Sequence, residues 1–203
     1  MKKITLILVS FFSIFSALQV NAQDLCGTED IDQKDIAQLI KDVQSINNKS
    51  GFGPGMAITP VGTITVPFQP HIVTRTDGTG GSNPAQVAVN ILATQVHYAA
   101  YGILLDVKPT LFVNDTALYD LVGTAAGDAG YPPYNVANHV NAYFINTAFI
   151  PGFGFIGGYA RFPWNGPDYF TVVNGNLEPN GATVAHEMGH YFGLLHTFET
   201  AFG

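Results

Sequence analysis

The start of the chain differs from the rest in its pattern of charge and hydrophobicity. Lys2 and Lys3 precede an apolar stretch at 4–18, and small residues follow at Val20-Asn21-Ala22. This order is typical of a secretory signal peptide. An N-terminal membrane anchor is the alternative, but the stretch is short and rich in Ser for a membrane span. We therefore expect a signal peptide at 1–22, a secreted, extracellular protein, and no stable membrane span once the signal is removed.

A second pattern places apolar residues at helical spacing over 31–46. Polar Lys, Asp and Gln residues separate these apolar positions, which are Ile36, Leu39, Ile40, Val43 and Ile46. Such spacing predicts a short amphipathic helix. Loop-forming residues follow at 47–55. We place a boundary there, between a small N-terminal segment at 23–57 and a main domain at 58–203.

The main domain begins with a β-branched, apolar run at 63–76, which predicts a strand. Pro67 and Pro70 within it favour an irregular or edge position, because proline cannot donate to a β ladder. Further strands and one loop rich in Gly, Ala and Pro follow from similar patterns. The strands are predicted at 103–114, 139–147, 157–162 and 168–174, and the loop at 123–135.

One long helix is predicted at 83–101. Asn83 is a good N-cap residue, and Pro84 then occupies the one helical position where proline is favoured. Gly102 suits the end of this helix. Two of the connections between strands are too short for helical crossovers. We therefore expect an α+β fold with a mixed sheet instead of a wholly parallel one.

Charge and cysteine content narrow the possible functions. Charged residues make up only 11% of the chain, and the formal net charge is −7. Loss of Lys2 and Lys3 with the signal makes the mature chain more acidic still. Nucleic-acid binding requires clustered Lys and Arg, so a nucleic-acid partner is not expected. Cys26 is the single cysteine, which leaves it free, paired with another chain, or paired with a residue beyond Gly203.

The residues that predict chemistry form one motif, HEMGHYFGLLH, at 186–196. His186 and His190 stand four residues apart, so both rings project from one face of a helix. Gly193 can adopt a left-handed conformation that ends the helix, which allows His196 to turn back as a third ligand. Three nitrogen ligands with one open position are typical of a catalytic zinc site. We expect one zinc ion here, held by the three histidines.

Glu187 is adjacent to a ligand but turned about 100° around the helix, so it is not expected to bind the metal itself. It can reach a metal-bound water and act as general base in peptide hydrolysis, with proteins or peptides as substrates. Two alternatives remain. One is a catalytically inactive zinc-binding module of the same fold that binds peptides, and the other is an exported structural protein that zinc stabilises. We expect His71, His97 and His139 to be ordinary strand, helix or loop residues.

The extended motif resembles the metzincin clan of zinc peptidases. The segment AHEMGHYFGLLHTF at 185–198 is similar to the pappalysin (cytophagalysin) family. Three shorter segments resemble the same family: VPF at 66–68, DGTG at 77–80 and GYARFP at 158–163. The resemblance covers about 60–198. It implies a zincin-like fold with a twisted five-stranded sheet, a backing helix at 83–101 and an active-site helix. It also implies that His186, His190 and His196 bind zinc and that Glu187 is the catalytic base.

The same resemblance implies a substrate-binding strand and a latent precursor. The family's edge strand pairs with extended peptides, which places Gly158, Tyr159 and Ala160 against the substrate, although ordinary strand structure is the alternative. Cys26-Gly27 matches a Cys-Gly pair that masks the metal in family pro-segments. We therefore interpret 23–57 as a pro-segment-like region of a zymogen, with Cys26 as a latency switch, although an unpaired or distantly paired cysteine explains Cys26 nearly as well.

The family also places a Met-turn, a lower subdomain, disulfides and calcium sites after the active-site helix. No methionine follows Met188, and the sequence ends at Gly203. We therefore expect 58–203 to represent the N-terminal subdomain of a metzincin catalytic domain, C-terminally incomplete, with any calcium bound only in the part beyond.

Overall fold

The computed structural model describes residues 26–28, 41 and 62–196. The signal peptide expected at 1–22 lies outside the described residues, as do most of the helix expected at 31–46 and the boundary at 47–57. Among the described residues, no helix is both long and apolar enough to cross a bilayer. The elements in chain order are β1 Ile64–Thr74, α3 Pro84–Ala99, β2 Ile103–Val107, β3 Leu111–Asn114, α4 Thr116–Tyr119, β4 Asp120–Val122, α5 Thr124–Gly130, η3 Pro132–Tyr134, β5 Val140–Ile145, β6 Thr147–Ile150, β7 Gly154–Ile156, β8 Gly158–Ala160, β9 Phe170–Val173, η4 Asn174–Asn176 and α6 Ala182–Tyr191.

The main sheet is mixed, as the sequence predicts. Its strands follow the order β2-β1-β5-β9-β8, and β3 adds a sixth strand beside the second half of β1. All neighbours are parallel except β8, which runs antiparallel to β9 at one end of the path. The expected five-stranded sheet is therefore present, with one additional strand.

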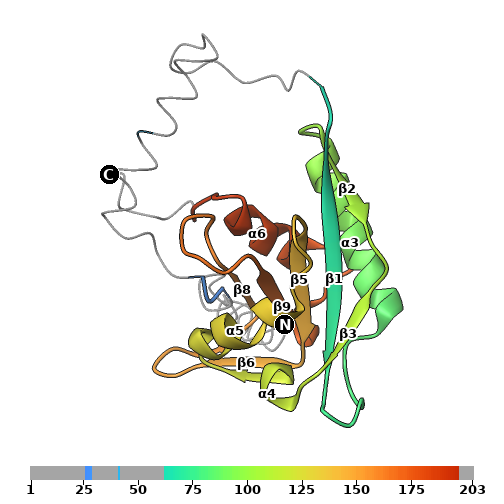
Figure 1. Cartoon of the computed structure of the whole chain (residues 1–203). Coiled ribbons are helices and arrows are strands. Elements are labelled where there is room, and N and C mark those ends of the chain that lie inside the picture. The colour runs from blue at the N-terminus through green and yellow to red at the C-terminus, as the bar shows by residue number, and fades with distance from the viewer. Residues whose placement is uncertain (1–25, 29–40, 42–61, 197–203) are drawn as a thin grey trace, which may run out of the picture.

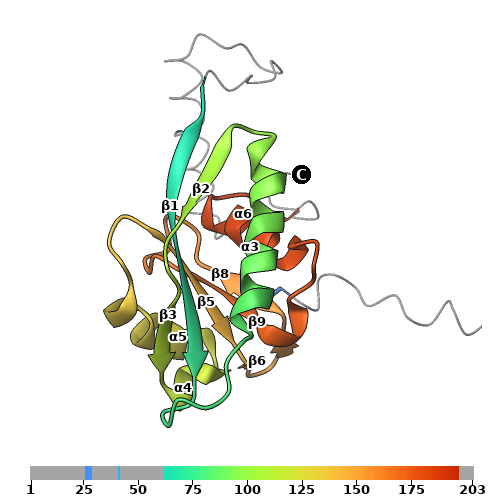
Figure 2. The same ribbon diagram turned by 90° about the vertical axis from the view of Figure 1, so that its right-hand side faces the viewer.

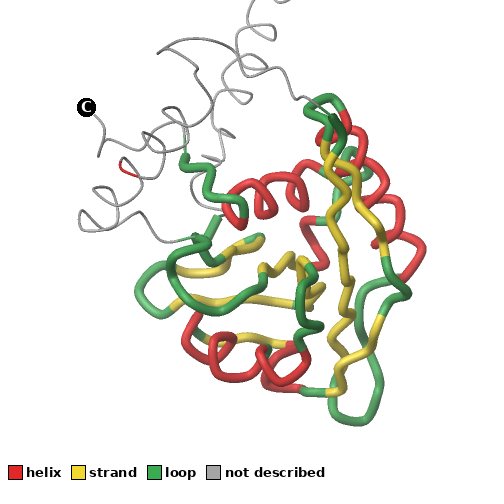
Figure 3. Tube along the Cα trace, turned by 45° about the horizontal axis from the view of Figure 1, so that its top comes forward, coloured by secondary structure: helices red, strands yellow, loops and turns green. Residues whose placement is uncertain are grey.

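Helices cover both faces of this sheet (Figures 1 and 3). On one face, α3 and α6 pack side by side, and apolar residues of both helices meet Phe68 and Ile72 of β1 in one core. On the other face, α4 and α5 lie with a small three-stranded sheet, in the order β4-β6-β7, over a second core rich in tyrosine. Figure 2 shows α3 along the sheet with α6 behind it. The predicted backing helix is confirmed as α3, which starts at Pro84 with Asn83 as its side-chain cap.

The first strand was expected in an irregular or an edge position, and the edge position is wrong, because β1 lies inside the sheet. Its two prolines are accommodated by gaps in the ladders on either side. The ladder with β2 ends at Phe68 and that with β3 begins at His71, so Pro70 lies opposite a gap. Pro67 precedes the first residue that pairs with β5, which is Phe68. Neither proline therefore removes a hydrogen bond that the sheet needs.

Two further expectations are corrected. The strand predicted at 103–114 is two strands, since Lys108-Pro109-Thr110 interrupts it and both halves pair in parallel with β1. The loop predicted at 123–135 contains α5 and the short helix η3. Its small residues allow close packing of α5 against the tyrosine core, so the Gly- and Ala-rich composition reflects tertiary contacts instead of a flexible loop. The small sheet was not predicted: β4 and β7 lie outside the predicted strands, and only Thr147 of β6 lies within one.

Candidate metal centre and peptide-binding edge

The helix α6 carries the first half of the motif at the centre of the molecule. The side chain of Asn180 accepts a hydrogen bond from the Ala182 amide at its start. Val184 and Met188 are fully buried in the core that α6 shares with α3 and the sheet. Tyr98 of α3 donates to the carbonyl of Ala185, which fixes α6 against its neighbour. The motif is therefore held by packing on one side of the helix.

A sharp turn after α6 brings His196 back toward the helix. The backbone of Gly193 has a φ of +90°, in the left-handed region that favours glycine. Its amide donates to the carbonyl of His190 at 2.8 Å. As a result, the His196 ring lies 4.3 Å from the His190 ring and 5.5 Å from the His186 ring, measured between centroids.

The three histidines converge with Cys26 from the N-terminal segment. One ligand atom from each of these residues lies within 4.8 Å of the other three. The Nε2 atoms of His186 and His190 are 3.0 Å apart, and Cys26 Sγ is 3.6 Å from His190 Nε2. Tetrahedral zinc would place two nitrogen ligands about 3.4 Å apart, and a nitrogen and a sulfur about 3.6 Å apart. The donor set and its spacing therefore fit one zinc ion.

The electrostatics of the cluster also suit a cation. Burial lowers the pKa of His190 to about 4, and burial together with the neighbouring His196 lowers the pKa of His186. Both rings are therefore neutral at pH 7 and have a lone pair to offer. The carbonyl of Leu194 accepts from His190 Nδ1 at 2.7 Å, which leaves Nε2 directed at the cluster. Burial, and secondarily Glu187, raises the pKa of the Cys26 thiol to about 12.

Glu187 is buried beside the cluster, with 1% of its surface exposed. Burial raises the pKa of its carboxyl group to about 8. The hydroxyl of Thr28 donates to Glu187 Oε2 at 3.3 Å. Glu187 also lies against the backbone of β8, because a Cβ atom on Gly158 would lie 3.0 Å from both the Cγ and the Oε1 of Glu187. Glu187 therefore lies between the N-terminal segment and the edge strand.

The strand β8 lies at the end of the main sheet, where the sequence places the peptide-binding edge. Its outer side is paired with residues 26–28. Cys26 and Gly158 form a parallel bridge, the Gly27 amide donates to the Gly158 carbonyl at 2.8 Å, and the Ala160 amide donates to the Thr28 hydroxyl at 2.9 Å. Tyr159 points the other way, into the tyrosine core. Gly158 and Ala160 thus present backbone groups to the N-terminal segment, whereas Tyr159 offers no side chain on that side.

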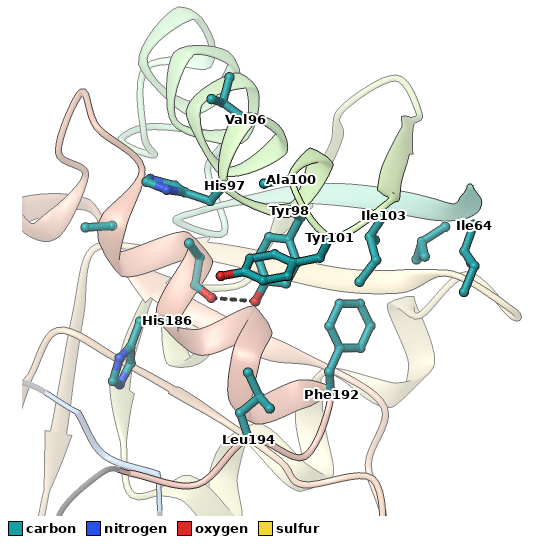
Figure 4. Close-up of a pocket in the computed structure, with 13 residues that line it drawn as sticks. Ile64, Val96, His97, Tyr98, Ala100, Tyr101, Ile103, His186, Phe192 and Leu194 are labelled. Atoms are coloured by element: carbon teal, nitrogen blue, oxygen red, sulfur yellow. Dashed lines mark hydrogen bonds between the residues drawn. The ribbon is translucent and has the colours of Figure 1, made fainter. Parts of the chain in front are cut away.

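A large apolar groove lies next to α6 and has a volume of about 1100 Å³. It lies between the C-terminal half of α3, the first residues of β1 and β2, and α6 (Figure 4). His186 and Leu194 of the motif line it, together with Tyr98, Tyr101 and Phe192. Of the three motif histidines, only His186 reaches this groove.

The three histidines outside the motif lie away from the cluster, as expected. His71 bonds to Asn141, His97 lies near the Asn180 carbonyl, and His139 bonds to Ala137, so none of them joins the cluster. Thr28 was not among the predicted site residues, although its hydroxyl contacts both Glu187 and β8. Its position directly after Cys26-Gly27 is the only sequence feature that could have identified it.

No family model matches this chain. An extracellular metalloprotease of Pyricularia oryzae is 27% identical, over 92% of this chain and 69% of its own length. The structure of a promirolysin mutant from Tannerella forsythia has a TM-score of 0.53 and 17% identity, over 85% of this chain and 69% of that chain. An archaemetzincin from Methanopyrus kandleri has a TM-score of 0.48 and 17% identity, over 70% of this chain and 81% of that chain. The chain has an α+β, zincin-like fold, as the sequence predicts.

Proposed function

We propose that this chain carries the metal site and catalytic base of a secreted, zinc-dependent metalloendopeptidase of the pappalysin type. The observation that carries the proposal is the convergence of His186, His190 and His196, with the carboxylate of Glu187 buried beside them. The similarity to an extracellular metalloprotease and the zincin-like fold support it. The signal-like residues 1–22 support export.

In this proposal the three imidazoles hold the zinc ion, and Glu187 moves the proton. Zinc bound there supplies Lewis-acid polarisation of a peptide carbonyl and of the attacking water. The carboxylate of Glu187 takes a proton from that water and then delivers it to the nitrogen of the leaving amine as the C–N bond breaks. The backbone of β8 orients the substrate, since Gly158 carbonyl and Ala160 amide are the groups that an extended peptide would bind.

The alternative is an inactive zinc-binding module that uses the same edge to hold peptides. Burying an acidic side chain next to metal ligands lowers the stability of the fold. A module that only binds peptides would gain nothing in return for this loss. Glu187 is buried at this position and hydrogen-bonded to Thr28. This arrangement favours the peptidase.

Peptide cleavage by the processed full-length protein tests the proposal. Casein and a peptide library are incubated with the parent, with the parent plus a chelator, and with Glu187→Gln. We expect the chelator to abolish cleavage and Glu187→Gln to lower kcat about 10²- to 10⁴-fold. The exposed Glu178, close to the start of α6, provides the matched control Glu178→Gln, which should stay fully active. Cleavage that neither treatment reduces would refute the mechanism.

We further propose that residues 23–57 are a pro-segment and that Cys26 keeps the enzyme latent. Cys26 Sγ lies within 4.8 Å of one ring nitrogen of each of the three histidines. In support of this role, a thiolate there could serve as a fourth ligand and displace the water that the reaction needs. Residues 27 and 28 bond to Gly158, Ala160 and Glu187, so they occupy the edge strand and the base at the same time. The unprocessed Cys26→Ala protein should therefore cleave peptides, and an unprocessed variant as latent as the parent would count against this role.

A further inference from the structure

A hydrogen-bonded network on the far side of β8 connects this short edge strand to α5. Both carboxylate oxygens of Asp128, on α5, accept hydrogen bonds from Arg161. Nε of Arg161 lies 2.9 Å from Oδ1, and Nη2 lies 2.6 Å from Oδ2. Tyr169 donates to the same carboxylate at 2.7 Å, and the hydroxyls of Tyr169 and Tyr159 are 2.8 Å apart. Tyr159 is the central residue of β8, and Arg161 follows the strand directly.

The side chains of this network are largely buried. Tyr159 and Tyr169 are fully buried, and the Arg161 and Asp128 side chains are 10% and 30% exposed. A bidentate salt bridge between Arg and a carboxylate is strong, and it is also directional because its two hydrogen bonds must be aligned at the same time. Removing one partner of such a pair at low exposure lowers stability. Asp128 therefore fixes both Arg161 and the tyrosine hydroxyls.

The approach of α5 to this network depends on Gly127. A Cβ atom at that residue would lie 2.1 Å from the hydroxyl of Tyr159 and 2.9 Å from the hydroxyl of Tyr169. The helix can therefore bring Asp128 up to the hydroxyls only because the preceding residue has no side chain. The strand β8 has only three residues and one neighbouring strand, β9, and it also packs against α6.

We propose that Asp128 is a positioning residue for peptide binding. It acts through Arg161 and Tyr159 to hold the backbone of β8 where it can pair with the substrate. The inference rests on the proposed function, in which Gly158 and Ala160 bind the peptide backbone. Asp128 itself touches no reacting group. Its loss should therefore weaken the binding of extended peptides and leave the chemical step nearly unchanged.

The test compares Asp128→Asn with the parent, both as processed full-length protein, on an extended peptide substrate. We expect KM to rise about 10-fold and kcat to change less than about 2-fold. The control is Asp120→Asn, because Asp120 also accepts two side-chain hydrogen bonds, from Asn146 and Thr147, but lies in the small sheet. It should keep the parent's KM. An unchanged KM in Asp128→Asn, or an equal rise in Asp120→Asn, would overturn the proposal.

Tyr169→Phe provides a second variant if Asp128→Asn does not fold. It removes the hydroxyl that joins Asp128 to Tyr159 and keeps the contact with Arg161, so KM should rise by a smaller factor. If the parent shows no chelator-sensitive cleavage, the proposed function fails, and amide hydrogen exchange then tests the positioning alone. Faster exchange of the β8 amides in Asp128→Asn than in Asp120→Asn would support it, and equal exchange would overturn it.

Discussion

Gly158 shows how tightly the Glu187 carboxyl group and the edge strand are packed. A Cβ atom there would lie 2.7 Å from the Thr171 carbonyl and 3.0 Å from the Glu187 side chain. Both distances are shorter than an ordinary van der Waals contact. The residue type at 158 therefore sets how closely Glu187 approaches β8. In the proposed mechanism this contact places the base next to the carbonyl of the bound peptide.

His71 is a buried residue of β1 whose titration should affect stability. Its Nε2 bonds to Asn141 Oδ1 at 3.0 Å, its ring stacks on Tyr143, and its buried Nδ1 has no hydrogen-bond partner among the described residues. Burial lowers its pKa below 6.5 in the folded protein. Protonation of Nδ1 would create a charged imidazolium whose new N–H group has no hydrogen-bond acceptor among the described residues.

The consequence is a loss of stability in acid. Because the folded pKa is the lower one, the unfolded state binds a proton first as pH falls below about 6.5, and the free energy of unfolding decreases until the folded pKa is reached. We expect His71→Gln, which cannot titrate, to show a shallower decrease between about pH 6.5 and pH 5 in urea unfolding. The histidines of the cluster contribute equally to both proteins, so the difference isolates His71. Identical slopes would contradict the prediction.

At the level of residues, the sequence predicted those whose spacing is local. The three histidines, Gly193 and Glu187 all lie within one helix and its end, so helical geometry alone placed them near one another. Thr28 and Asp128 could not be found in this way, because their partners lie more than thirty residues away and their contacts depend on the sheet. Cys26 was identified by family resemblance and not by spacing.

At the level of elements, the sequence was a good guide to the two longest described helices, α3 and α6, and a poorer guide to the short helices and short strands. The helix α3 was predicted almost to its ends, because Asn83 and Pro84 fix the start and apolar spacing continues through it. The position of β1 was missed because proline excludes a strand interior only where the ladder is continuous. Pro70 lies at a gap between β2 and β3 that the sequence does not reveal.

The helix α5 is a different case, since its sequence TAAGDAG has a poor intrinsic preference for a helix. Tertiary packing overrides that preference. Gly127 allows close contact with the tyrosines, and a Cβ on Gly130 would lie 2.5 Å from Leu118 Cδ2. Asp128 then reaches Arg161 from the same turn. An element that looks like a loop in the sequence therefore forms the support of the candidate peptide-binding strand.

At the scale of the whole molecule, the N-terminal segment joins the two parts of the candidate site. Residues 26–28 contact His190 of α6 through the thiol and β8 through the backbone. The hydroxyl of Thr28 connects these two contacts, because it accepts from the Ala160 amide and donates to Glu187. The candidate metal ligands, the candidate base and the edge strand are thus covered by three consecutive residues, more than 100 positions away in the sequence. A short segment covers all three groups because β8 lies directly beside α6.

This arrangement predicts a separate contribution of Thr28 to latency. In the unprocessed full-length chain, Thr28→Val keeps the shape of the side chain but removes the hydroxyl. With a pKa of about 8 the Glu187 carboxyl is mostly neutral at pH 7. A hydrogen bond between neutral groups is worth about 0.5–1.5 kcal/mol, so the basal rate of peptide cleavage should rise about 2- to 10-fold. Thr28→Ser retains the hydroxyl and should stay as latent as the parent. Because Cys26 is intact in both variants, a difference between them reports the hydroxyl alone. Equal basal rates for Thr28→Val and Thr28→Ser would mean that the thiol masks the site without help from its neighbour.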